Sequence, residues 1–269
     1  MKYCKEFRVK PGARVRLKEY NPDDTGGLCD RAEAEKPTEK NIQRLSELEY
    51  LLYAESRRSL LVVLQAMDAG GKDGTVRHVM SGLNPQNCRV TSFKAPSATE
   101  LAHDFLWRIH AAVPAKGEVG IFNRSHYEDV LVARVHGLVS EKTWRGRYEQ
   151  INRFEDSLSK NNIRVLKFFL HISKAEQRKR LEERLKDPAK NWKISPADLA
   201  ERKRWGDYVE AYEEALGRCS TDEAPWFIIP ANHKWFRNLA VSQIIVEALE
   251  EMHMKFPPPS FDVSKVRLK

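Results

Sequence analysis

The sequence predicts an α/β fold in which a parallel sheet of about five strands lies between two layers of helices. Short apolar segments alternate along the chain with longer amphipathic segments, a pattern typical of parallel sheets covered by helices on both faces. The first such segment, residues 60–65, is apolar almost throughout, as expected for a central strand. The 269 residues suffice for one domain of this kind with an inserted segment.

The first part of the chain is irregular and then becomes periodic. Residues 1–37 are rich in Pro, Gly and Asp and predict an N-terminal arm wrapped on the domain. Thr38 is expected to cap a helix with the apolar face Ile42, Leu45, Leu48 and Leu52. The elements that follow the 60–65 strand are a helix at about 71–82, a strand at 89–93, a helix at 97–109 opened by a capping box, and a strand at 119–122.

The second half continues the alternation of helices and strands. The expected elements are helices at 127–135 and 144–158, a strand at 163–172, a helix capped at 173–176, a helix that begins at 195–196, a strand at 226–229 and a helix at 234–253. Three prolines at 257–259 end the periodic pattern, so residues 257–269 are expected to form a loose C-terminal tail.

The loop after the first strand has the composition of a phosphate-binding loop. Gly70, Gly71 and Gly74 allow the backbone to close on phosphate oxygens, and Lys72 follows where a helix should begin. The match departs from the usual motif at two positions, because Ala66 replaces the first glycine and Asp73 replaces the Ser or Thr that normally holds magnesium.

Asp68 lies inside this loop. A carboxylate beside phosphates would be repelled unless a divalent cation lay between them, so we favour a magnesium ligand. The alternative is that Asp68 only accepts a hydrogen bond from the loop backbone.

A second polar segment follows the strand at 119–122. Asn123 and Arg124 should lie at the carboxyl edge of the sheet, where Arg124 can bond two phosphate oxygens. Glu128 lies one helical turn later and is a candidate metal ligand or base, although an Arg–Glu pair that holds a turn fits nearly as well. His126 is expected to be a structural or surface residue.

The net charge of +8 indicates an acidic partner, and much of it is local. Residues 174–204 contain 11 Lys/Arg and 6 Asp/Glu. A helix–loop–helix of this composition can close as a lid over a transferring phosphate, here about 178–208, although a solvated helix explains part of the charge. Trp192 and Trp205 could stack on a base, but anchoring of the lid on the core is the expected use.

Five motifs in order resemble the polyphosphate kinase 2 family, most closely its class III branch. They are QAMDAGGKDGT (65–75), FNRSHYEDVL (122–131), FFLHIS–EQ–R–RL (168–185), DPAKNWKIS (187–195) and APWFIIPANHKWFRN (224–238). The resemblance implies a P-loop kinase-like domain over 38–256 with the helical lid inserted. It also implies Mg²⁺-dependent transfer, with Mn²⁺ as a possible substitute, of a phosphoryl group between inorganic polyphosphate and AMP or ADP.

The resemblance also implies roles for single residues. Asp68 binds the metal, and Lys72, Arg124 and Arg178 hold the phosphates during transfer. Glu128 stays a second candidate metal ligand because of its position after Arg124, not because of the resemblance. Some relatives carry Asp at the position of Asn123. The remaining candidates for phosphate or nucleotide binding are Ala69, Gly70, Gly71, Asp73, Gly74, Thr75, Asn123, Glu128, Arg184 and Lys193.

Two other functions remain open at this point. An ATP-dependent nucleoside monophosphate kinase could use the same loop and lid, but Asp73 after the lysine and the excess positive charge disfavour it. A nucleic-acid-binding protein could use the basic segment, but no helix-turn-helix, RRM or zinc-finger pattern is present.

The composition of the chain indicates its cellular location and the state of its cysteines. No segment is long and apolar enough to span a membrane, and no secretory signal is visible, so we expect a cytoplasmic protein. The four cysteines form no zinc-ligand pattern and are expected to be free thiols. We expect a homo-oligomer of unspecified size.

Overall fold

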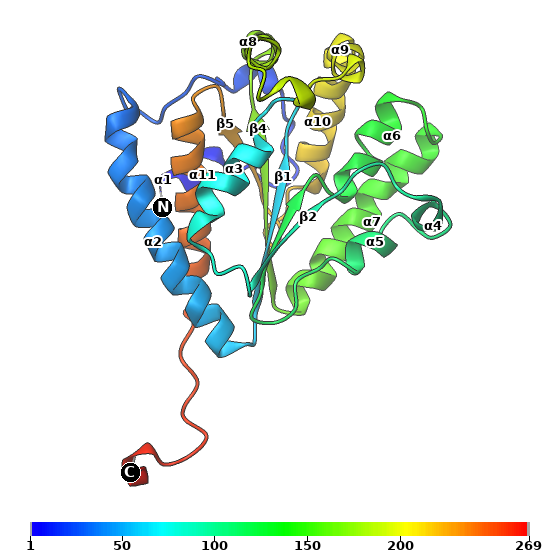
Figure 1. Ribbon diagram of the computed structural model, residues 1–269. Helices are drawn as coiled ribbons and strands as arrows, with labels where there is room; N and C mark the ends of the chain where they lie inside the picture. The colour runs from blue at the N-terminus through cyan, green and yellow to red at the C-terminus, as the bar shows by residue number, and fades with distance from the viewer. Residues whose placement is uncertain (1, 268–269) are drawn as a thin grey trace.

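The computed structural model describes residues 2–267 and is built around a five-stranded sheet in which every pairing is parallel (Figure 1). The strands are β1 (Ser59–Gln65), β2 (Cys88–Ser92), β3 (Val119–Asn123), β4 (Ile163–His171) and β5 (Trp226–Pro230), in the spatial order β2-β3-β1-β4-β5. Each predicted strand is confirmed to within one residue at either end, and the predicted α/β fold class is confirmed.

The central strand β1 is buried along its whole length, as its apolar sequence predicted. Leu60, Val62 and Leu64 pack into the hydrophobic core on one face of the sheet, and Leu61 and Val63 pack into the core on the other face. This alternation follows from the two-residue period of a strand. The sheet therefore separates two cores and needs helices on both sides.

Two groups of helices cover the two faces of the sheet (Figure 1). On one face lie α1 (Lys2–Phe7), α2 (Arg31–Glu55), α3 (Lys72–Val79) and α11 (Lys234–Glu250). On the other lie α5 (Trp107–His110), α6 (Val132–Val135), α7 (Glu141–Lys160) and α10 (Trp205–Cys219), with the short α4 (Ala98–Leu101) beside them. The predicted three layers are present.

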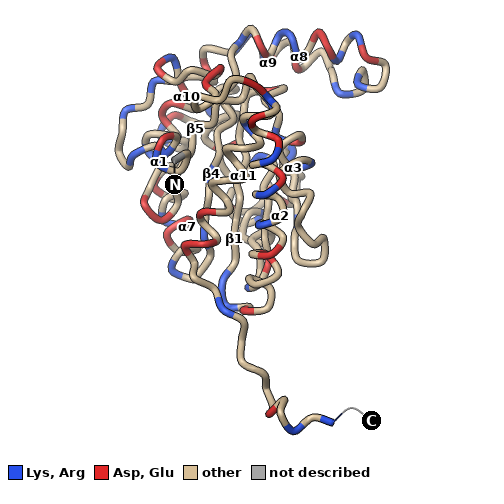
Figure 2. Tube along the Cα trace, turned by 90° about the vertical axis from the view of Figure 1, so that its left-hand side faces the viewer, with Lys and Arg blue, Asp and Glu red and all other residues tan. Residues whose placement is uncertain are grey.

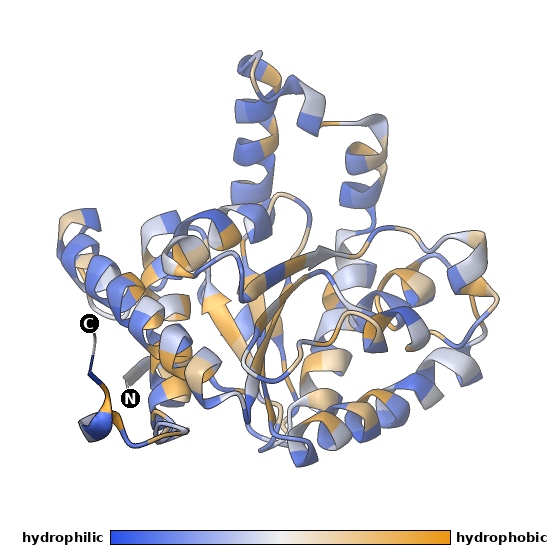
Figure 3. Cartoon of the chain, turned by 60° about the horizontal axis from the view of Figure 1, so that its bottom comes forward, coloured by the Kyte–Doolittle hydropathy of each residue, from blue (hydrophilic) through white to orange (hydrophobic). Residues whose placement is uncertain are grey.

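The basic segment forms the predicted helix–loop–helix. It consists of α8 (Lys174–Lys186), a 3₁₀ turn at Asn191–Lys193 and α9 (Pro196–Lys203), and it projects beyond the body of the protein (Figure 2). Its helices are mostly hydrophilic (Figure 3). Trp205 packs against both cores as expected, but Trp192 is 76% exposed, so its predicted role as a core anchor is wrong.

The start of the first long helix was predicted wrongly. Helix α2 begins at Arg31 rather than after Thr38, and Asp30 caps it by accepting hydrogen bonds from the amides of Ala32 (2.8 Å) and Glu33 (3.2 Å). Pro37 lies inside the helix. A proline removes one helical hydrogen bond, but packing of α2 against α11 keeps the helix continuous.

Two other predicted helices are shorter than expected. The segment 97–109 is divided into α4 and α5, because the side chain of Asp104 accepts a hydrogen bond from the amide of Leu106 (2.9 Å) and starts a new turn. The segment 127–135 is a 3₁₀ turn at His126–Asp129 followed by α6. Residues 71–82 are confirmed as α3 with a final 3₁₀ turn at Met80–Gly82.

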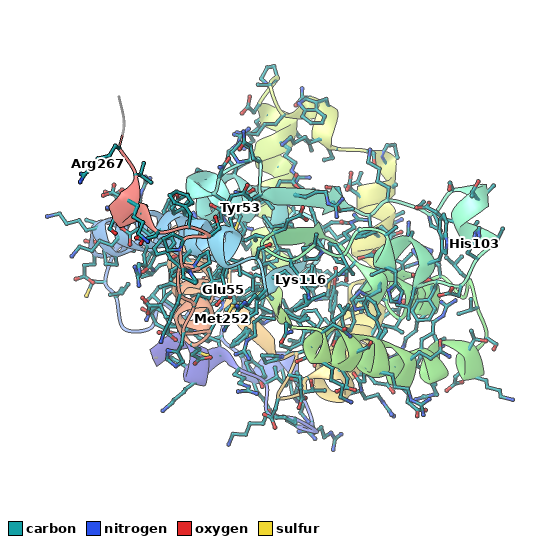
Figure 4. The ribbon with its side chains drawn as sticks, turned by 90° about the horizontal axis from the view of Figure 1, so that it is seen from below. Tyr53, Glu55, His103, Lys116, Met252 and Arg267 are labelled. Atoms are coloured by element: carbon teal, nitrogen blue, oxygen red, sulfur yellow. The ribbon has the colours of Figure 1, made fainter. Side chains whose placement is uncertain are left out.

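The end of the sheet opposite the helix–loop–helix is formed by the amino ends of the strands and the adjoining helix ends. Tyr53, Lys116 and Met252 lie at the end opposite the lid, and Arg267 lies on the C-terminal segment away from the body (Figure 4). Residues 257–267 are exposed throughout, in keeping with the predicted tail. The division into arm, domain and tail stays a prediction, and α2 crosses the predicted boundary at residue 37.

Candidate active site

The loop between β1 and α3 is tightly folded. The amide of Gly70 donates to the carbonyl of Met67 (2.9 Å), and a Cβ on Gly70 would collide with the side chain of Ala66. Ala69 (φ 59°) and Gly71 (φ 103°) adopt left-handed conformations just before α3 begins at Lys72. The first backbone amides of α3 have no acceptor within the helix, so they can bind an anion at its N-terminus.

Lys72 reaches back over this loop. Its Nζ donates to the carbonyl oxygen of Ala66 (3.2 Å), so the side chain is held at the mouth of the loop. Burial lowers the pKa of the Lys72 amine, and the neighbouring Arg124 lowers it further. The structure thus holds the Lys72 amine against the loop between β1 and α3.

Arg124 and Asp68 are brought together from two strands. Arg124 follows β3 with a left-handed backbone (φ 62°), and its Nη2 lies 3.4 Å from Oδ1 of Asp68. Its Nη1 lies 3.9 Å from Oε2 of Glu128. Burial alone would lower the pKa of Arg124, but the carboxylates of Glu128 and Asp68 outweigh it and raise the pKa above its usual value. Burial raises the pKa of Glu128, against the effect of Arg124 and Lys72.

Other loop candidates have defined partners. Asn123 donates from Nδ2 to Oδ1 of Asp73 (2.8 Å), so these two candidates fix each other at the carboxyl edge of the sheet. Thr75 is fully buried and its hydroxyl donates to the carbonyl of Gly71 (3.2 Å). Thr75 therefore supports the loop from the core side and does not line the cleft described below.

A cleft of about 1440 Å³ opens in front of the loop. Predicted site residues that line it are Asp68, Ala69, Gly70, Gly71, Lys72, Asp73, Gly74, Asn123, Arg124, Arg184 and Lys193. The lid side also contributes Lys179, Arg180 and Lys190, and basic side chains outnumber acidic ones around the cleft. The basic segment therefore forms one wall of the cleft.

A second cavity of about 290 Å³ is lined in part by Asp68 and Arg124. Its walls include Glu128 and several apolar or aromatic side chains: Leu131, Val132, Trp205, Tyr208 and Tyr212. Asp68 and Arg124 line both cavities, whereas Glu128 lines only the smaller one. The two spaces thus meet at the Asp68–Arg124 pair and at Asp198 of α9, which also lines both.

Arg178 lies outside both cavities. Its side chain is 72% exposed and its Nε is bonded to Oε1 of Glu182 (2.7 Å). Two residues further along α8, Arg180 is buried and donates from Nη1 to the carbonyl of Ala69 in the loop (3.0 Å). Helical geometry explains the difference, because residues two apart lie on opposite sides of a helix. The structure does not bring Arg178 to the other site residues.

Sequence reasoning missed Arg180 and Arg237 as site residues. Both line the cleft, and Arg237 lies in the first turns of α11, after β5. The available signal was position, since a residue that closely follows a parallel strand lies at the carboxyl edge where ligands bind.

His126 is completely buried, with Nε2 3.1 Å from Oε1 of Glu155. This partner confirms the structural role expected for His126. The four cysteines are free, as predicted, and three of them are at least partly buried.

The donor set fits a magnesium ion that is completed by substrate. Among residues 2–267, no three carboxylate, histidine or cysteine side chains cluster as a full metal cage. Mg²⁺ commonly binds one or two carboxylates together with phosphate oxygens and water. The partly exposed carboxylate of Asp68, placed between the two cavities, offers such a ligand.

Comparison with known proteins adds an independent line of evidence. The family model for polyphosphate kinase 2 (PPK2) matches residues 28–257. An AMP/ADP-polyphosphate phosphotransferase from Meiothermus ruber is 52% identical, over 97% of this chain and 98% of the relative. An ADP-polyphosphate phosphotransferase from Rhodopseudomonas palustris is 46% identical, over 94% and 92% respectively.

A solved structure is also similar along most of its length. The crystal structure of polyphosphate kinase 2 from Arthrobacter aurescens TC1 superposes with a TM-score of 0.94 at 43% sequence identity. It covers 97% of this chain, and 94% of that structure is matched.

Proposed function

The chain belongs to the polyphosphate kinase 2 family, and we propose that it transfers a phosphoryl group from inorganic polyphosphate to AMP and ADP. The products are ADP and ATP, and the reverse reaction uses the same site. The names of the Meiothermus ruber and Rhodopseudomonas palustris relatives support this choice of donor and acceptors.

The observation that carries the proposal is the pair of unequal cavities that meet at Asp68 and Arg124. The large basic cleft suits a long, flexible polyanion that offers no base for recognition. The smaller cavity combines aromatic and apolar walls with a few polar groups, which suits the nucleoside of the acceptor. Donor and acceptor would then approach the Asp68–Arg124 pair from opposite sides.

The site residues can lower the barrier through position and charge. Phosphoryl transfer spreads negative charge over the equatorial oxygens, and we infer that the cations of Lys72 and Arg124 stabilise that charge. The α3 amides hold the phosphate, and the lid wall limits access of water. A magnesium ion on Asp68 would neutralise further phosphate charge. No covalent enzyme intermediate is required.

The test is incubation with long-chain polyphosphate, Mg²⁺ and AMP, with ADP and ATP measured by chromatography. We expect both products, and we expect EDTA to abolish them. ADP alone, with ADP inert as acceptor, would restrict the enzyme to the first step. No product with polyphosphate but product with ATP as donor would support the nucleoside monophosphate kinase instead.

Three further expectations need separate tests. Replacement of Mg²⁺ by Mn²⁺ in the same assay tests metal choice, and light scattering tests the expected homo-oligomer. No helix among residues 2–267 is both long and apolar enough to cross a membrane. A cytoplasmic location stays a prediction, to be tested by cell fractionation.

A further inference from the structure

Arg237 is a buried cation without a carboxylate partner. Its side chain is 2% exposed, and its hydrogen bonds within residues 2–267 go only to Oδ1 of the adjacent Asn238, from Nε (3.2 Å) and Nη2 (2.7 Å). No ion pair joins it to any described acidic residue. Buried arginines normally have a bonded anion, because an uncompensated charge is costly to bury.

The guanidinium group lies directly against the phosphate-binding loop. A Cβ on Gly71 would collide with Nη1 of Arg237, and a Cβ on Gly74 would lie 3.3 Å from Nη2. Glycine at these two positions therefore makes room for Arg237 as well as for the turn. Arg237 also lines the large cleft and does not line the smaller cavity.

Three sources of positive charge meet at this point. The N-terminus of α3 carries a partial positive charge, and Arg180 approaches the same loop through its bond to Ala69. Arg180 has a carboxylate partner in Glu176 (2.8 Å), but Arg237 has none among the described residues. Burial and the nearby Arg180 lower the pKa of Arg237 to about 10. The arrangement becomes favourable when an anion is bound.

We propose that Arg237, supported by Arg180, binds a phosphate group of the polyphosphate donor beside the group held by the loop. The assignment to the donor follows from the cleft, since Arg237 lines the large basic cleft and not the smaller aromatic cavity. The inference rests on the proposed function for the identity of its ligand. It adds a donor-binding residue from α11 to those that follow β1 and β3.

The main test compares Arg237→Met and Arg237→Lys with the wild type. At saturating AMP, the KM for polyphosphate should rise about tenfold or more for Arg237→Met and less for Arg237→Lys, because a charge-assisted hydrogen bond is lost or weakened. The KM for AMP at saturating polyphosphate should change less than twofold. Arg44→Met is the control, because Arg44 pairs with Glu250 at the other end of α11, away from the cleft.

A second variant disturbs Arg237 without replacing it. Gly74→Ala introduces a methyl group against Nη2, while its backbone stays compatible with alanine because Gly74 has no positive φ. It should raise the KM for polyphosphate, and Gly74→Ala/Arg237→Met should be no worse than Arg237→Met alone. This variant keeps the inference testable if Arg237→Met does not fold.

Binding is measured separately from activity by the rise in Tm on addition of inorganic tripolyphosphate. We expect the rise to be smaller in Arg237→Met than in the wild type. An unchanged KM for polyphosphate and an unchanged Tm response in the folded variants would overturn the inference, as would an equal increase in the KM for AMP. If wild type forms no product from polyphosphate, the proposed function fails. A Tm response that still depends on Arg237 would then uphold Arg237 as a polyphosphate-binding residue.

Discussion

Lys167 and Arg237 are both buried cations, but their surroundings differ. Lys167, on β4, is ion-paired with Glu155 and donates to Oη of Tyr127 (2.9 Å) and the carbonyl of Cys219 (2.6 Å). Arg237 lies at the loop and is bonded only to the amide oxygen of Asn238 within the described chain. Lys167 has a full set of acceptors and stabilises the fold. Arg237 lies beside a cleft and has no carboxylate partner among the described residues, so it is available to bind an anionic ligand.

The Lys167 cluster also explains how the second polar segment is held. Glu155 accepts from Tyr127 (2.9 Å) and lies 3.1 Å from His126, and these two residues lie between Arg124 and Glu128 in the chain. The cluster thereby fixes the 3₁₀ turn that follows Arg124. The buried cluster thus stabilises the position of Arg124. The residues along the cleft are not part of this cluster and can bind substrate.

The largest loss of stability should come from removal of one member of the buried Glu155–Lys167 ion pair. Glu155→Gln leaves the ammonium group of Lys167 buried without its counter-charge, so we expect a loss of about 3–5 kcal/mol in the free energy of unfolding. Urea denaturation measures it. In Glu155→Gln/Lys167→Met neither charge remains, and the double variant should be more stable than the single. Simple additivity of the two losses would show that the charges are not coupled.

Substitution of residues that face the cleft should lower turnover and leave the free energy of unfolding nearly unchanged. Lys72→Ala and Asp68→Ala should each lower turnover about 10²- to 10³-fold, because they act on charge that develops during transfer. Their urea midpoints should stay close to that of the wild type. Asp68→Asn serves as the matched variant of similar shape. If folded Asp68→Ala turned over at the wild-type rate, Asp68 would have no part in the mechanism.

A smaller effect should separate the two arginines of α8. The sequence predicted a phosphate-binding role for Arg178, but Arg180 touches the loop and Arg178 is paired with Glu182 on the surface. We expect Arg180→Ala to lower kcat/KM about tenfold or more, as loss of a charged hydrogen-bonding group does, and Arg178→Ala to change it less than twofold. A greater loss in Arg178→Ala would mean that lid closure brings that side chain to the phosphates.

The smallest effect concerns pH. Burial would raise the pKa of Glu155, but Lys167 and His126 outweigh it and hold that pKa below the ordinary value of 4.5. A carboxylate with a lowered pKa stabilises the fold above its unfolded pKa, and this contribution is lost as pH falls. The stability gap between wild type and Glu155→Gln should therefore be constant near neutral pH and narrow below pH 4.5. A gap unchanged down to pH 3 would contradict the assigned charge.

Much of the fold and part of the site follow from the sequence alone. Four of the strands were predicted because each is an apolar segment bounded by polar residues, whereas β2 (CRVTS) is half polar and mostly exposed. Burial on both faces of β1 follows from its unbroken apolar run. The loop at 66–75 and the place of Asn123 and Arg124 followed from the rule that parallel strands end at one edge. These features depend on residues close together in the chain, so local patterns carry the information.

Only the tertiary structure decided which charged side chains meet. Arg180 rather than Arg178 faces the loop because of how α8 is rotated on the body, and Arg237 lies against Gly71 because α11 packs beside α3. The continuation of α2 through Pro37 likewise depends on its packing against α11. Lys167 and Glu155 pair across the interface between β4 and α7. Each of these contacts joins residues of different elements, and its energy depends on burial and distance, which the order of residues alone does not specify.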